Sequence, residues 1–151
     1  MNNDRDIEKL VTDCANEQLF GVLATRCGDC LHTSIVAFAA SESLNEIVFA
    51  TPESSRKYAN LTGHPSVSLF IDNRQNDASR LYDITGITIP GTASIVDPER
   101  DAVLVQRYID KHPGLRGFIE SRSTKIIRID VDRYDIVTKF RKVQTLHVEK
   151  G

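Results

Sequence analysis

Residues 20–51 read FGVLATRCGDCLHTSIVAFAASESLNEIVFAT, and this stretch decides the fold class. Three of its runs are rich in Val, Ile, Phe and Thr and are typical of β-strands: FGVLATR (20–26), LHTSIVAFAA (31–40) and EIVFAT (46–51). The connections between them are only CGDC (27–30) and SESLN (41–45). A parallel pair needs a crossover of a dozen residues or more, so connections this short predict antiparallel strands.

Later stretches of the chain extend the predicted sheet to six or seven strands. They are SVSLFID (66–72), DITGITIPGTASIV (83–96), TKIIRIDVDRYDIVTKF (124–140) as one or two strands, and VQTLHV (143–148). Gly86, Pro90 and Gly91 interrupt the second of these and predict a bulge or a bend, as at a barrel corner. The pattern predicts a mainly β fold, a β-barrel with peripheral helices.

Helices are predicted between and around these strands. They cover 4–18, 54–62, a segment from Asp97-Pro98 to His112, and a short piece in LRGFIES (115–121). Gly63 is interpreted as the C-terminal cap of the second helix. Asp97 is interpreted as the cap of the third, with Pro98 at the first helical position.

Composition narrows the class of protein. The chain has 151 residues, of which 40% are hydrophobic and 26% charged, as in an ordinary globular protein of one domain. A net charge of -2 gives no general attraction to nucleic acid or to an anionic membrane. No apolar run reaches the ~20 residues of a membrane span, and the polar start MNNDRDIEKL predicts a cytoplasmic protein.

The segment TPESSRKYANL (51–61) stands where a strand gives way to a helix. Ser54 or Ser55 can cap that helix or donate a hydroxyl to a phosphate oxygen, while Arg56 and Lys57 add positive charge near the N-terminal N–H groups. The alternative is a capped surface helix whose two cations are simply solvated. The segment alone leaves both interpretations open.

The surrounding sequence resembles the pyridoxamine 5'-phosphate oxidase-like family of FMN-binding split barrels. The matching pieces occur in the family's order: FGVLAT (20–25), HTSIVAFA (32–39), IVFAT (47–51), SSRKYANL (54–61), PSVSLFIDNR (65–74) and GTASIV (91–96). YDIVTKF (134–140) and VQTL (143–146) also look like the family's closing strands. The most specific piece is the T-x-x-x-S-R-K element after the third strand.

This resemblance implies one FMN-binding domain over residues 1–151, a six-stranded antiparallel split barrel. It also implies a homodimer with FMN in the grooves between subunits. In the family the S-R-K element holds the FMN phosphate and the second strand runs beside the flavin ring, with its backbone more important than its side chains. The cofactor-binding residues carried over are Ser34, Ile35, Val36, Thr51, Ser55, Arg56 and Lys57.

The chain also departs from the oxidases that act on pyridoxine phosphate. Those enzymes carry a C-terminal Arg-x-His motif with a tryptophan upstream, whereas this chain has no tryptophan and ends KVQTLHVEKG. They place a flavin-contacting glutamine just before the fifth strand, where this chain has Thr85 or Gly86. These differences argue against pyridoxine phosphate as the substrate and leave the FMN phosphate site intact.

Cysteines and histidines offer competing motifs. Cys27 and Cys30 have C-x-x-C spacing, but they flank a Gly-Asp turn and lack a second pair for zinc, so they are interpreted as part of a hairpin turn that could oxidise to a cross-hairpin disulfide. His64 and His112 precede prolines and look like turn residues. His147 could ligate haem, and no metal site is predicted.

Three hypotheses remain from sequence. The first is an FMN-dependent oxidoreductase acting on an unknown small molecule or electron donor, with no side chain assigned as catalytic acid or base. The second is a flavin-binding protein that serves as an electron carrier, sensor or reservoir. The third keeps the barrel and replaces FMN with haem or deazaflavin F420.

Overall fold

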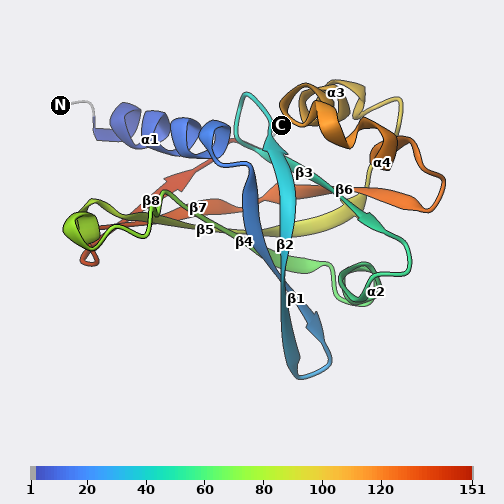
Figure 1. Ribbon diagram of the computed structural model, residues 1–151, viewed down its shortest axis with the longest axis horizontal. Coiled ribbons are helices and arrows are strands. Elements are labelled where there is room, and N and C mark those ends of the chain that lie inside the picture. The colour runs from blue at the N-terminus through green and yellow to red at the C-terminus, as the bar shows by residue number, and fades with distance from the viewer. Residues whose placement is uncertain (1–2, 151) are drawn as a thin grey trace.

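The computed structural model describes residues 3–150, which form one antiparallel sheet of eight strands with helices around it (Figure 1). The strands are β1 (Phe20–Cys27), β2 (Cys30–Ala40), β3 (Glu46–Pro52), β4 (Ser66–Asp72), β5 (Thr85–Ile95), β6 (Thr124–Val131), β7 (Arg133–Thr138) and β8 (Lys142–His147). The α-helices are α1 (Asn3–Glu17), α2 (Arg56–Gly63), α3 (Ala102–Lys111) and α4 (Arg116–Glu120). Two 3-10 segments are η1 (Ala78–Asp83) and η2 (Pro113–Leu115).

Six of the strands close into a barrel. Their order is β4-β1-β2-β3-β6-β5, and β5 pairs back onto β4. Strands β7 and β8 extend the sheet from β5 outside the ring. The predicted six-stranded antiparallel barrel with peripheral helices is therefore confirmed, and the stretch 124–140 divides into two strands at Asp132.

Strand β5 changes partners where a bulge or bend was expected. It runs without interruption through Gly86, Pro90 and Gly91, in unbroken register with β4. On its other edge it pairs first with β7 and then, from Gly91 onward, with β6. A β-carbon on Gly91 would overlap the carbonyl oxygen of Asp130. The glycine therefore serves the close approach of two strands. The predicted irregularity is present on this edge alone: from Thr88 to Gly91 β5 advances three residues while its partners advance four, from Asp135 to Val131, as in a bulge.

Two apolar clusters hold the fold together. The larger fills the barrel and includes Leu23, Phe38, Phe49, Leu69 and Ile89, with α1 and α2 contributing at its ends. The smaller lies between α3, α4 and the outer faces of the strands: Ala39, Val48, Val96, Leu104, Tyr108 and Ile119. Burial on both faces of β3 explains why EIVFA reads as a continuous apolar run rather than as an alternating one.

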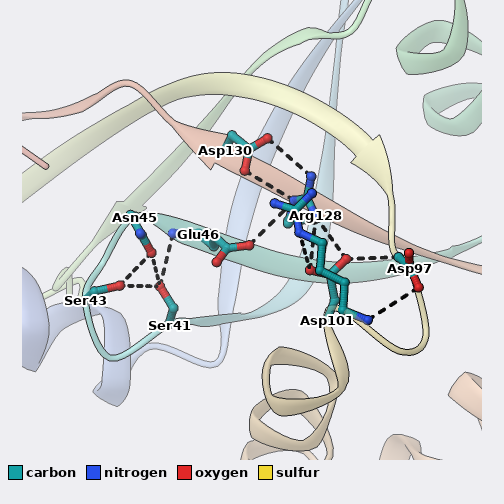
Figure 2. A network of polar contacts seen from close by, with 9 residues as sticks. Ser41, Ser43, Asn45, Glu46, Asp97, Asp101, Arg128 and Asp130 are labelled. Atoms are coloured by element: carbon teal, nitrogen blue, oxygen red, sulfur yellow. Dashed lines mark hydrogen bonds and ion pairs between the residues drawn. The ribbon is translucent and has the colours of Figure 1, made fainter. Parts of the chain in front are cut away.

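An ion pair anchors the start of α3 to the barrel (Figure 2). Arg128 of β6 is 7% exposed, and its Nη1 donates to both carboxylate oxygens of Asp101 at 3.0 and 2.9 Å. Asp101 also accepts the backbone N–H of Asp97 at 2.9 Å. The helix begins at Ala102 and not at Pro98 as predicted. Asp97 instead caps a turn, because its Oδ1 accepts from the backbone nitrogen of Glu99 at 3.0 Å.

One smaller prediction was also wrong. Gly63 is the last helical residue of α2 and the cap is His64, which has extended backbone (φ -136°), so no left-handed glycine is needed there. His112 lies between α3 and η2, as its position before proline predicted, and it is buried: it is 9% exposed, and its Nε2 lies 2.8 Å from the carbonyl oxygen of Phe38. Burial lowers the pKa of His112.

No helix within residues 3–150 combines the length and the apolar character that a membrane crossing requires.

Candidate functional site

The barrel is split between β2 and β3. These strands pair at only three positions, Phe38 with Phe49, Ala39 with Val48 and Ala40 with Ile47. Beyond Phe49, β3 continues alone beside β6, while residues 30–37 of β2 pair only with β1. Figure 1 shows the two strands diverging, with the β1–β2 hairpin projecting away from the barrel. On alternate residues, the edge of β2 that faces this split therefore presents backbone N–H and C=O groups without a strand partner.

The end of β3 and the start of α2 meet through two hydroxyls. Thr51 Oγ1 and Ser55 Oγ lie 2.7 Å apart, and Thr51 is only 1% exposed. Ser55 is the N-cap of α2, and its Oγ accepts the backbone N–H of Tyr58 at 3.2 Å. The predicted spacing T-x-x-x-S thus becomes a direct contact, and Ser55 rather than Ser54 is the cap.

Arg56 and Lys57 open the first turn of α2 directly after this cap. Arg56 is exposed and Lys57 half-buried, and neither takes part in an ion pair among the described residues. The nearby Glu53 pairs instead with Lys125 at 3.8 Å. Both cations are therefore available beside the backbone N–H groups that every helix N-terminus leaves without an intrahelical acceptor.

The inner side of α2 fixes this turn against the barrel. Leu61 is 2% exposed within the barrel core, and Tyr58 packs against the same cluster. Asn60, which is 5% exposed, donates from Nδ2 to Thr25 Oγ1 of β1 at 3.1 Å. Sequence reasoning missed the Asn60–Thr25 bond, because a lone asparagine in a helix carries no signal about its partner on a distant strand.

The three predicted residues of β2 alternate in direction. Ile35 is 71% exposed, whereas Val36 is buried. Ser34 Oγ is buried and has no hydrogen-bond partner among the described residues. No hydrogen bond within residues 3–150 joins these three residues to Thr51 or to the start of α2. The two predicted groups therefore lie apart, one on β2 and the other at the end of β3 and the start of α2.

The polar residues that follow β4 have structural partners. Arg74 pairs with Asp72 at 2.7 Å, and Asn73 accepts the backbone N–H of Thr85 at 2.7 Å. These contacts make the segment after β4 an ordered polar turn. His147 is exposed at the end of β8.

Two cavities are found elsewhere on the described part of the chain, the first beside the segment of β6 that pairs with the end of β3. One, of about 370 Å³, lies between α3 and the end of β5 and is mainly apolar. The other, of about 530 Å³, lies under the segment from Asn73 to Ile84. No group of three or more His, Cys, Asp or Glu side chains in residues 3–150 is arranged to hold a metal ion.

The sequence of this chain matches a known protein family. A family model described as Pyridoxamine 5'-phosphate oxidase matches residues 7–138. A pyridoxamine 5'-phosphate oxidase homolog of Schizosaccharomyces pombe is 23% identical over 162 aligned positions, covering 87% of this chain and 85% of the relative.

Solved structures share the fold at low identity. A haem-binding protein from Mycobacterium smegmatis is 17% identical with a TM-score of 0.78 over 89% of this chain, and the chain spans 55% of that protein's length. A FAD-binding protein from Mesorhizobium loti is 12% identical with a TM-score of 0.70, over 85% of this chain and 90% of that protein. Since the family model covers most of the sequence, the chain belongs to the pyridoxamine 5'-phosphate oxidase family.

Proposed function

We propose that the chain is an FMN-binding flavoprotein and acts as an FMN-dependent oxidoreductase on a small molecule. The observation that carries this proposal is the start of α2, where a hydrogen-bonded pair of hydroxyls, a helix N-terminus and two cations that form no ion pair within residues 3–150 occur together. Membership of the pyridoxamine 5'-phosphate oxidase family is consistent with it, and so is the FAD-binding protein of similar fold.

The hydroxyl pair has one hydrogen left to donate. Thr51 and Ser55 together carry two hydroxyl hydrogens, and the 2.7 Å contact between them uses one. Ser55 Oγ accepts from Tyr58 N, which uses a lone pair and no hydrogen. When Thr51 donates to Ser55, the half-buried Ser55 hydroxyl keeps its own hydrogen and can donate it to a phosphate oxygen while the helix cap stays intact.

The positive charge at the start of α2 also favours a phosphate ligand. A phosphate monoester is dianionic near neutral pH, and Arg56 offers a planar two-donor fork while Lys57 offers a point charge. The N-terminus of α2 adds a partial positive charge. A capped surface helix would need none of these features except Ser55.

The flavin ring fits the edge of β2. Residues Ser34, Ile35 and Val36 lie on the part of this strand that has no partner on the side of the split, so its free backbone groups could bond the polar edge of the ring. The buried, unpartnered Ser34 Oγ is a further donor or acceptor for such a group. When bound, FMN would supply hydride or single-electron transfer, and the protein would bind and orient it.

We further propose a cytoplasmic homodimer of a single domain, with FMN between the subunits. Phe20, Ile35 and Phe70 are 58%, 71% and 37% exposed, and the strand registers place them on one outer face of β1, β2 and β4. An apolar face of this kind is typical of a covered surface. A second copy of the chain would cover it and complete the walls of the FMN groove.

The test compares FMN binding by the wild type and by the double variant Arg56→Ala, Lys57→Ala. Each charge-assisted contact contributes about 1.5–3 kcal/mol, so the dissociation constant should rise at least about 100-fold. Binding is followed by flavin fluorescence and absorption, with mass analysis of any released chromophore. The control, Arg5→Ala with Lys9→Ala, removes the same charge from the exposed face of α1 and should bind like the wild type. Unchanged affinity in the first variant would show that the phosphate lies elsewhere.

Haem is the second candidate ligand, favoured by the fold that the chain shares with a haem-binding protein. His147 is exposed on β8 and could serve as an axial ligand. In that case the purified or reconstituted protein should show a haem absorption band that His147→Ala abolishes. A flavin spectrum without turnover of any reductant would instead favour the role of carrier, sensor or reservoir.

A further inference from the structure

The tip of the β1–β2 hairpin carries two cysteines that the proposed flavin site does not use. Cys27 ends β1 and Cys30 begins β2, and the two are direct cross-strand partners. Only Gly28 and Asp29 separate them. Gly28 has φ of 59°, the left-handed backbone that a two-residue hairpin turn requires at its first central position.

The pairing brings the two sulfurs within reach of each other. Direct partners in an antiparallel pair have Cα atoms about 4.5–5.5 Å apart, inside the range of about 4.4–6.8 Å that disulfides span. Partners also project from the same face of the sheet, so both side chains point to one side of the hairpin. A bond between them needs side-chain rotation and no rearrangement of the strands.

Cys27 and Cys30 differ from the third cysteine, Cys14, in their exposure to solvent. Cys27 and Cys30 are both exposed free thiols, and nothing lies within 4 Å of the position that a β-carbon on Gly28 would occupy. Cys14 is buried in the barrel core at 6% exposure, and burial raises the pKa of its thiol to about 11. Reagents in solvent should therefore reach the pair and not Cys14.

We propose that Cys27 and Cys30 form a reversible dithiol–disulfide site that exchanges with low-molecular-weight disulfides of the glutathione class. One cysteine thiolate attacks a sulfur of glutathione disulfide, whose S–S bond breaks and releases one glutathione thiolate. The other cysteine thiolate then attacks the protein sulfur of the mixed disulfide, forming the Cys27–Cys30 bond and releasing the second glutathione. The two protein thiols are oxidised, one glutathione disulfide is reduced to two thiols, and the two protons pass to the departing thiolates.

We expect the Cys27–Cys30 disulfide to form reversibly and not to be a permanent structural disulfide. Exposed disulfides are the easily reduced ones, and a bond across a two-residue turn closes too short a loop to resist reduction strongly. Excess reduced glutathione or another thiol should therefore restore both cysteines. This inference does not depend on the identity of the cofactor.

The experiment treats the purified full-length protein with glutathione disulfide, alkylates the remaining thiols without unfolding, and measures intact and peptide masses. We expect the loss of two hydrogens, one cross-linked peptide containing Cys27 and Cys30, and full recovery of both thiols on reduction. Cys14→Ser should behave like the wild type. Cys27→Ser and Cys30→Ser should each stop at one bound glutathione, because the attacking partner is missing.

Three results would overturn the proposal. The first is a wild-type protein that accumulates two glutathione adducts without closing the bond. The second is a protein that stays fully reduced while a small exposed dithiol peptide in the same tube oxidises. The third is a disulfide that joins two chains, seen as a dimer on a non-reducing gel.

Discussion

Ser55 combines two roles that substitution can separate. Asp and Asn cap helices about as well as Ser, so Ser55→Asp and Ser55→Asn should each leave the free energy of unfolding within about 0.5 kcal/mol of the wild type. Aspartate, however, would place a negative charge where we propose the phosphate to bind. We expect Ser55→Asp to weaken FMN binding on the order of 100-fold relative to Ser55→Asn, measured by fluorescence titration. Equal affinities would mean that Ser55 only caps α2.

Asp101 illustrates what a single buried charge does for stability. Its carboxylate is the closest partner of Arg128, while Glu46 and Asp130 lie farther from the same guanidinium at 3.5 and 3.2 Å. Asp101→Ala should lower the free energy of unfolding by about 3 kcal/mol, because a buried cation loses its main partner. Asp130→Ala, whose side chain is 52% exposed, should cost under about 1 kcal/mol. Denaturant unfolding of both variants checks the contrast, which similar losses would contradict.

At the scale of elements, Lys111 ties the end of α1 to α3 and the barrel. Its Nζ donates to the carbonyl oxygens of Ala15 and Gln18 at 2.8 and 2.7 Å, and it lies 4.0 Å from the centre of the Phe38 ring. Burial lowers the pKa of Lys111 from 10.5 to about 8. A neutral amine still has two N–H donors for the two carbonyls, so deprotonation of Lys111 need not break either hydrogen bond.

The lowered pKa of Lys111 makes the free energy of unfolding depend on pH in one direction. Between pH 8 and 10.5 the unfolded chain binds more protons at this lysine than the folded chain does, so its contribution to stability rises with pH across that window. The free energy of unfolding of the wild type, relative to Lys111→Met, should increase by roughly 1–2 kcal/mol over the window after allowance for solvent screening. Urea unfolding at several pH values measures this. A constant difference between the two proteins would contradict it.

Strands were the elements that sequence predicted best. Alternation and β-branched residues located β1 to β4 almost to the residue, and short connections fixed their antiparallel pairing. The start of α3 was misplaced because Asp-Pro is also a good turn, and only the buried Arg128 shows that Asp101 marks the true start. The role of Gly91 could not be predicted from the sequence either, since the strand that approaches it lies far away along the chain.

The candidate site was predicted in part. The S-R-K element could be located because its residues are consecutive, and its N-cap serine follows from helix chemistry. The hydroxyl contact between Thr51 and Ser55, the Asn60–Thr25 bond and the split between β2 and β3 depend on how strands and helix pack. Such contacts between separate elements leave no local pattern in the sequence.

At the scale of the whole molecule, the outer face of β1, β2 and β4 predicts how copies associate. Phe20→Glu places a charge on this face, and twofold symmetry makes the change count twice in a dimer. Each buried phenylalanine contributes about 1.5–3 kcal/mol, so the dimer dissociation constant should rise at least 100-fold. Light scattering across a concentration series measures it. Val103→Glu alters an exposed apolar residue on α3 and should leave association unchanged. A monomeric wild type would refute the dimer.

The position of β6 in the barrel has a consequence for the newly made chain. This strand lies between β3 and β5, and it pairs Glu46 with Asp130 and Gly91 with Val131. Because β3 and β5 are synthesised before β6, one edge of each strand stays unpaired while residues 96–123 are translated. Open edges of apolar strands invite pairing with other chains. The stretch of synthesis before β6 emerges is therefore the time when these two strand edges are most open to pairing with another chain.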